Sequence, residues 1–138
     1  MKDGTPAWSA IAVVFNGPRN VLAISRGFNT RDPGFPGGDS EETDASPAQT
    51  ASRELFEETG VTALELRCID QWVGERGQPV FAFYIPRWRC ARLRTSSEGK
   101  PFWTHPDTLV KKTAFYCNEA RNVFEKLAVA ASAPAAVE

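Results

Sequence analysis

The stretch 46-SPAQTASRELFEETGV-61 decides the fold, because it carries the clearest helix start and stop signals in the chain. Ser46 is a favoured N-cap residue, Pro47 is tolerated in a first turn, and Gln49 completes a capping box. Gly60 stands where a left-handed residue commonly ends a helix. We therefore predict a helix that begins at about Pro47 and ends just before Gly60.

Three carboxylates stand close together inside this predicted helix. Residues three and four apart are neighbours on a helix surface, so Glu54, Glu57 and Glu58 share one face. Each like-charged pair costs an isolated helix about 0.2–0.5 kcal/mol. The acids adjoin the apolar sector that contains Ala51 and Leu55, so we expect them at the edge of the buried face. Such a cluster is stable with raised pKa values or with a bound hard cation, and the alternative is an ordinary solvated face.

Strand patterns surround this helix. The expected strands are Ala7 to Phe15, Val21 to Ser25, Leu64 to Val73 and Pro79 to Ile85, followed by a short apolar stretch from Pro101 to Trp103. We interpret residues 26–43, which are rich in Gly and Pro, as a loop. An apolar period over 120–131 predicts a second amphipathic helix, and the tail 132–138 is expected to be frayed. Together these elements indicate an α/β fold with a mixed sheet covered by helices.

Composition narrows the class of protein. The chain has 138 residues, 42% of them hydrophobic and 24% charged, and its net charge is −1. These values predict one globular domain over residues 1–138, and the net charge gives no general field for duplex nucleic acid or an acidic membrane. The three cysteines are scattered and there is one histidine, so neither a disulfide framework nor a Cys/His zinc site is expected. Without a signal peptide or a membrane span, we expect a cytoplasmic protein.

The segment 38–61 resembles the Nudix box, GX₅EX₇REUXEEXGU, in which U is a bulky aliphatic residue. The matching positions are Gly38, Arg53, Glu54, Leu55, Glu57, Glu58, Gly60 and Val61. The box follows Phe35-Pro36-Gly37-Gly38, which we interpret as a tight turn whose backbone can approach a ligand closely. The resemblance implies a Nudix-type α/β/α sandwich, in which a mixed sheet lies between helices.

One position departs from the pattern. Asp44 replaces the first glutamate of the box, and eight residues rather than seven separate it from Arg53. The extra residue falls before Ser46, in the loop, so the register of the three glutamates is unchanged. In the family the first acid pairs with the box arginine and holds the loop against the helix. The shorter, shifted side chain of Asp44 leaves that pairing an open question.

The resemblance also implies an activity. Nudix hydrolases cleave a nucleoside diphosphate linked to another group, by attack of water at phosphorus with a divalent metal, here Mg²⁺ with Mn²⁺ as a substitute. We expect Glu57 and Glu58 as the principal metal ligands, with the carbonyl of Gly37 completing the first site. Glu54 is the candidate general base or second-metal ligand, and Arg53 belongs to the catalytic set. Family members divide the role of the base differently.

A further acid comes from a later loop in many members of the family. Glu98, before Phe102 and Trp103, is the candidate metal ligand here, much as an EG pair precedes a tryptophan in MutT-type enzymes. The alternatives are a solvated loop glutamate at this position, or Glu75 in the turn 74–77 as the additional acid.

Three residues are candidates for substrate binding. Asn118 stands where an asparagine of MutT-type enzymes reads the purine edge, although it also suits the N-cap of the last helix. Phe35 is placed to stack on a base, or else to fill the core. Arg26, at the end of the second strand, is placed to meet a phosphate, or else is simply solvated.

The resemblance favours a nucleoside triphosphate pyrophosphohydrolase that releases a monophosphate and pyrophosphate, with 8-oxo-dGTP as the first substrate to test. Rivals are a hydrolase of nucleotide sugars or dinucleoside polyphosphates, and a Nudix-like domain that senses a nucleotide without cleaving it. The expected partner is a small nucleotide, with no duplex nucleic acid and no membrane, and a homodimer is left open.

Overall fold

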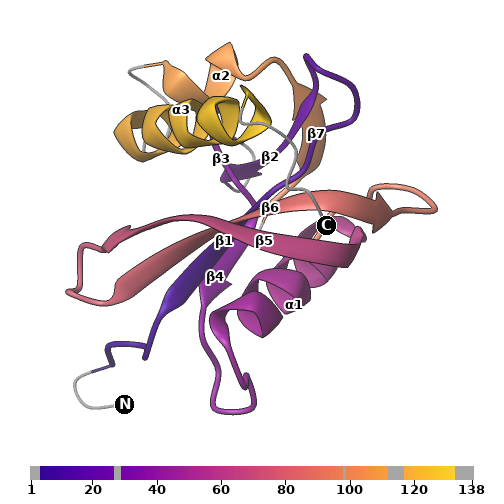
Figure 1. Ribbon diagram of the computed structural model, residues 1–138. Helices are drawn as coiled ribbons and strands as arrows, with labels where there is room; N and C mark the ends of the chain where they lie inside the picture. Colours follow the sequence, from indigo (N-terminus) through magenta and orange to yellow (C-terminus); the bar gives the residue numbers. More distant parts are fainter. Residues whose placement is uncertain (1–3, 27–28, 98, 112–116, 133–138) are drawn as a thin grey trace.

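The computed structural model describes residues 4–26, 29–97, 99–111 and 117–132 (Figure 1). The expectations for Glu98 and for most of the tail fall outside these ranges. The strands are β1 Ser9–Val13, β2 Val21–Arg26, β3 Asn29–Gly34, β4 Gly37–Asp39, β5 Thr62–Val73, β6 Pro79–Arg89 and β7 Pro101–Thr104. The helices are α1 Pro47–Thr59, α2 Asp107–Val110 and α3 Cys117–Ser132.

The strands form two sheets. A four-stranded sheet has the order β4-β1-β6-β5, with β1 parallel to β6 and the other neighbours antiparallel. A three-stranded antiparallel sheet has the order β3-β2-β7. In Figure 1, α1 lies against one side of the four-stranded sheet, and α2 and α3 lie with the smaller sheet on the other side. This arrangement confirms the predicted mixed α/β fold.

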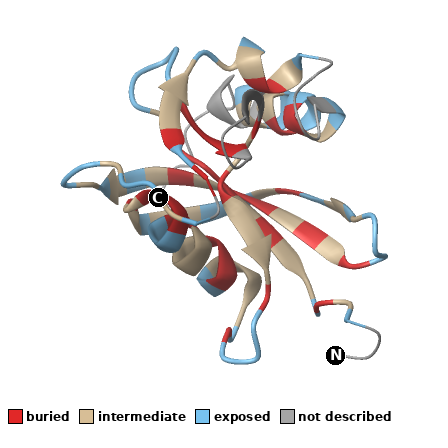
Figure 2. Ribbon diagram, turned by 180° about the vertical axis from the view of Figure 1, so that it is seen from behind, coloured by how far each residue is buried: buried red, intermediate tan, exposed pale blue. Residues whose placement is uncertain are grey.

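Two clusters of buried apolar side chains hold these layers together. One joins α1 to the large sheet through residues such as Leu55, Val61 and Ile85, and the other joins α3 to the opposite side through Val13 and Val123. Figure 2 shows buried residues along the central strands and on the inner side of α1, whereas the turns are exposed. No helix in the described ranges is long and apolar enough to cross a membrane.

Helix α1 has the ends that its sequence predicts. Its N-cap Ser46 accepts a hydrogen bond from the backbone N–H of Gln49 at 3.2 Å. Gly60 has φ 85° and donates its N–H to Phe56 O at 2.9 Å, so the helix ends in a left-handed glycine. Leu55 is fully buried, so the apolar sector beside the acids faces the core.

The prediction that residues 26–43 form a loop is wrong. The segment contains β3 and β4, and Gly37 and Gly38 pair with Ile11 and Ala10 of β1 rather than forming a tight turn. A Cβ at Gly37 would lie 2.3 Å from Ala10 O, so glycine here permits a close strand contact. The Gly and Pro content therefore marked a strand edge where we expected a turn.

Strands β5 and β6 form a hairpin and are longer than the predicted strands 64–73 and 79–85, and the short helix α2 was not predicted. Pairing continues to Thr62↔Arg89, beyond Pro86, through register shifts that are typical of β-bulges. Helix α3 packs on the sheet and places Lys126 Nζ 2.5 Å from Asp70 Oδ1 on β5. The turn end of this hairpin borders a cleft, together with α2 and α3.

Candidate active site

Gly37 and Gly38, here called the glycine corner, lie directly against the carboxylates of α1. The backbone N–H of Gly37 donates to Glu58 Oε1 at 2.9 Å. A Cβ on Gly38 would lie 2.7 Å from Glu54 Cδ. Pairing of β4 with β1 and packing of α1 on both strands fix this juxtaposition. The structure therefore brings together the glycines and acids that the sequence predicts as one site.

The three acids differ in their exposure to solvent. Glu58 is 5% exposed, the side chain of Glu54 is 16% exposed, and that of Glu57 is 53% exposed. Burial raises the pKa of Glu54, and repulsion from Glu57 adds to this, although hydrogen bonds from Glu58 and Arg53 act in the opposite direction. The acids are thus at the edge of the buried face, as the helix pattern predicts.

Arg53 holds the loop before the helix against the site. Its Nε and Nη2 donate to Asp44 Oδ1 and Oδ2 at 3.0 and 2.8 Å, and its Nη1 reaches Glu54 at 3.0 Å and Glu57 at 3.2 Å. The Arg53 guanidinium holds the pKa of Asp44 well below its ordinary value. Asp44 therefore makes the acid–arginine pair that the family pattern predicts, despite its shorter side chain and shifted position.

The donor set fits a hard divalent cation in its chemistry. Every candidate ligand is a carboxylate or carbonyl oxygen, which is what Mg²⁺ and Mn²⁺ prefer. The positive charge of a cation would also offset the effects of burial and of repulsion from Glu57, which raise the pKa of Glu54. Within the described ranges, no three Asp, Glu, His or Cys side chains converge closely enough to hold a metal as they stand. Arg53 engages Glu57, and the Gly37 N–H engages Glu58.

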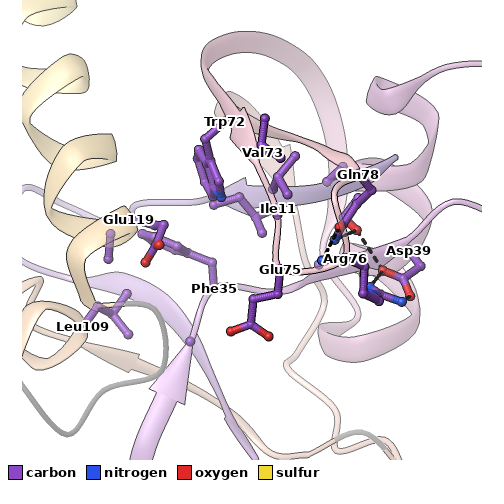
Figure 3. Close-up of a pocket in the computed structure, with 18 residues that line it drawn as sticks. Ile11, Phe35, Asp39, Trp72, Val73, Glu75, Arg76, Gln78, Leu109 and Glu119 are labelled. Atoms are coloured by element: carbon purple, nitrogen blue, oxygen red, sulfur yellow. Dashed lines mark hydrogen bonds and ion pairs between the residues drawn. The ribbon is translucent and has the colours of Figure 1, made fainter. Parts of the chain in front are cut away.

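A cleft of about 400 Å³ opens beside the glycine corner, between the large sheet and α2–α3. Its apolar wall includes Ile11, Phe35, Trp72, Val80, Leu109 and Ala120. Its polar wall includes Asp39, Glu75, Arg76, Gln78 and Glu119. Figure 3 shows the aromatic side chains of Phe35 and Trp72 together with the carboxylates of Glu75 and Glu119 around this space. The volume and the apolar lining suit a small-molecule ligand.

The predicted substrate-binding residues have different outcomes. Phe35 lines the cleft, and its ring also packs edge-on against Phe124 at 5.5 Å, so it serves both the cleft and the core. Asn118 is exposed in the first turn of α3 and accepts a hydrogen bond from Arg121, and because the helix begins at Cys117 the N-cap alternative is wrong. The next residue, Glu119, lines the cleft instead. The side chain of Arg26, like Glu98, lies outside the described part of the structure.

The sequence interpretation missed Trp72 and Arg76, although it placed Glu75 in the same turn. A turn between two paired strands was a usable signal for the hairpin. The turn sequence alone does not show which strand the turn faces. In the structure it faces β4, which lies in the segment that we expected to be a loop.

The two glycines of the corner are expected to respond differently to alanine. In Gly37→Ala the new Cβ meets fixed backbone at Ala10 O, so we expect a loss of about 1–3 kcal/mol in unfolding free energy. In Gly38→Ala the Cβ meets the movable end of Glu54, so stability should change less while activity falls. Urea unfolding and turnover of both variants check this contrast, and equal stability losses would contradict it.

Glu54→Gln is expected to stabilise the metal-free protein at pH 8. The pKa of Glu54 is raised in the folded state, so the ionised side chain lowers the free energy of unfolding. This loss disappears as pH falls and the side chain is protonated. The neutral variant lacks this penalty, and single stabilising substitutions typically add about 0.5–2 kcal/mol. Urea unfolding in chelator should show a gain at pH 8 that shrinks towards pH 4. A variant less stable than the parent at pH 8 would contradict the assignment.

The fold and the site define a mixed α/β domain in which Gly37 and Gly38 contact the carboxylates of α1 and also line a ligand-sized cleft. Residues 5–131 match the NUDIX domain family, and the chain therefore belongs to the Nudix hydrolase family. No curated protein matches the chain closely enough to be counted as a relative.

Solved structures agree with this fold. The chain is similar to the MutT Nudix hydrolase from Burkholderia pseudomallei, with a TM-score of 0.70 and 16% identity over 89% of this chain and 98% of that one. It is similar to the MutT protein from Methanosarcina mazei Go1, with a TM-score of 0.69 and 24% identity over 94% of this chain and 99% of that one. It is also similar to the Nudix domain of Shewanella oneidensis NrtR complexed with ADP ribose, with a TM-score of 0.70 and 20% identity over 93% of this chain and 90% of that one.

Proposed function

We propose that this protein hydrolyses a nucleoside triphosphate to the monophosphate and pyrophosphate in a metal-dependent reaction. The observation that carries the proposal is the contact between the carboxylates of α1 and the glycine corner, at the edge of the cleft. A polyphosphate brings negative charge to an acidic site, so its binding there requires intervening cations. The cleft then takes the nucleoside, and the carboxylates take the end where the bond is cleaved.

Glu57, Glu58 and the carbonyl of Gly37 would hold Mg²⁺, for which Mn²⁺ can substitute. When bound, this ion would supply positive charge to the phosphoryl oxygens and help to activate the attacking water. Glu54, whose pKa is raised by burial, is the candidate for accepting a proton from the attacking water or for holding a second metal. Arg53 contacts both Glu54 and Glu57, so it fixes the positions of these side chains.

Three side chains of the cleft are candidates for binding the base. Phe35 and Trp72 offer aromatic surface for a base, and Glu119 offers an acceptor for base N–H groups. The 8-oxo derivative of dGTP is the first substrate to test because of the resemblance to MutT-type enzymes.

A second candidate is hydrolysis or sensing of another nucleoside diphosphate derivative. The observation that favours it is the similarity to the NrtR Nudix domain, which was solved with ADP ribose. Retention of Glu54, Glu57 and Glu58 supports catalysis over sensing, since all three candidate acids are present in the described site.

A nucleotide panel tests these candidates. The protein is incubated with Mg²⁺ and canonical or oxidised (d)NTPs, ADP ribose, nucleotide sugars and dinucleoside polyphosphates, and pyrophosphate is measured separately from phosphate. We expect pyrophosphate from a triphosphate, and no product in chelator. Mg²⁺ at about 100 times its dissociation constant should also stabilise the fold by about 2.7 kcal/mol. Binding without turnover of any compound would favour the sensing candidate.

A further inference from the structure

Arg76 gives the described part of the cleft wall a positive charge, at the end away from Glu119 (Figure 3). Among the described residues that line the cleft, Arg76 in the turn between β5 and β6 is the only lysine or arginine. Its Nη2 and Nη1 bind Asp39 Oδ1 and Oδ2 at 2.7 and 3.0 Å. Asp39 directly follows Gly38, so this ion pair adjoins the glycine corner (Figure 3).

The turn that carries Arg76 is organised by a buried glutamine. Gln78 is 6% exposed, and its Oε1 accepts the backbone N–H of Arg76 at 3.0 Å. The N–H of Gly74 donates to the carbonyl of Gln78 at 2.7 Å, and a Cβ on Gly74 would lie 2.5 Å from the Gln78 amide nitrogen. The Arg76 backbone is therefore fixed, while its side chain is 48% exposed and is able to change rotamer.

The Arg76–Asp39 pair is a weak one to separate. The side chains are 48% and 45% exposed, and ion pairs in such positions typically contribute about 0–1 kcal/mol. A guanidinium presents the same fork of donors to a phosphate as to a carboxylate. Asp39 also accepts a hydrogen bond from Ser9 Oγ at 2.8 Å, so it keeps a partner if Arg76 turns away.

The charges and shape of the cleft give this exchange a direction. The other acids of the lining, Glu75 and Glu119, repel a phosphate chain. Figure 3 shows Phe35 and Leu109 at one end of the cleft and the Arg76–Asp39 pair at the other. A base at the apolar end would leave its phosphates at the end that holds Arg76.

We propose that Arg76 exchanges Asp39 for the terminal phosphate of the bound nucleotide, so that Asp39 is a built-in competitor for that phosphate. This inference rests on the proposed function, because it assumes a phosphate chain beside the glycine corner. The proposal names a specificity determinant in the β5–β6 turn, in addition to the glutamates of α1. Substrates that end in a phosphate at this position gain the contact, and the Asp39 carboxylate sets how much they gain.

Opposite effects of two substitutions test the exchange. Binding of inorganic pyrophosphate with Mg²⁺ is measured by calorimetry for the parent, Arg76→Gln, Asp39→Asn and the double variant. Loss of a charge-assisted contact should weaken binding about 10- to 100-fold in Arg76→Gln. Release of Arg76 should tighten binding about two- to fivefold in Asp39→Asn. In the Arg76→Gln background, Asp39→Asn should have no further effect.

Three outcomes would overturn the proposal. Unchanged affinity in Arg76→Gln would remove the phosphate contact. Weaker binding in Asp39→Asn would make the pair a structural link whose two ends act alike. Equal tightening by Asp39→Asn in both backgrounds would reflect only the loss of a negative charge.

The test separates this inference from the proposed function. Pyrophosphate binding is measurable whether or not any nucleotide is cleaved, and the nucleotide panel is scored on the parent protein alone. An active parent whose Arg76 variants bind pyrophosphate normally would retain the hydrolase and lose the exchange.

Discussion

Glu57→Gln is expected to lower turnover by at least two to three decades while the protein stays folded. The substitution keeps the size of the side chain but removes the charge that we assign to metal binding and to the phosphoryl site. Loss of one key electrostatic group in an active site typically reduces the rate by about 10²–10³-fold. Steady-state turnover of the best nucleotide in saturating Mg²⁺ measures the effect.

Glu41→Gln is a matched control for this variant. Glu41 Oε1 lies 3.4 Å from Arg53 Nη1, and Glu57 Oε2 lies 3.2 Å from the same atom. The two carboxylates are also similarly exposed, at 59% and 53%. Both variants therefore remove one exposed partner of Arg53, and only Glu57→Gln removes a proposed metal ligand. Equal turnover in the two variants would remove Glu57 from the site.

Asp44→Asn is expected to reduce the free energy of unfolding by about 3–5 kcal/mol, the range for breaking a buried ion pair. The Asp44 side chain is 2% exposed and accepts hydrogen bonds from Arg53, from Thr50 Oγ1 and from the backbone of Glu41. An asparagine retains the shape but has one acceptor oxygen and an NH₂ donor in place of two acceptor oxygens, so Arg53 loses a hydrogen-bond partner in a largely buried position. Urea unfolding measures the loss.

The dependence of this loss on pH follows from the pKa of Asp44. Because the folded-state pKa is lowered, the stabilisation is fully present above the ordinary value of 3.8 and is lost as pH falls towards the folded-state pKa. The gap between parent and variant should therefore stay constant from pH 8 to pH 5 and narrow below about pH 4.

Asp39→Asn is the control for burial in that experiment. Asp39 also forms a two-pronged pair with an arginine, Arg76, but its side chain is 45% exposed. Exposed pairs contribute about 0–1 kcal/mol, so the variant should unfold almost like the parent. A loss at Asp39 as large as the loss at Asp44 would show that burial does not set the energy of these pairs.

Helix α1 could be predicted from the sequence because its signals are local. The N-cap, the apolar period, the acids and the final glycine all lie within the stretch 46–61, and each depends on neighbours no more than a turn away. The pairing of Asp44 with Arg53 was an expectation of the family pattern, and the length of the aspartate side chain alone did not decide it.

The cleft was only partly predictable because it depends on long-range strand pairing. Strand β4 contains two glycines, which have no side chains to show an alternating pattern, so its pairing with β1 left no mark in the sequence. That pairing brings Asp39 to Arg76, which is 37 residues away. Asn118 was chosen by position in a family pattern, and a shift of one residue on α3 places Glu119 in the cleft instead.

Because Arg53 pairs with Asp44, Glu54 and Glu57 from within the chain, we expect the domain to reach its native state without an external ion. Chelation should therefore abolish turnover reversibly while the protein stays folded. Small zinc domains, in contrast, unfold when their ion is removed. Purification in EDTA followed by Mg²⁺ would then return full competence, which makes the empty form a practical starting material for titrations.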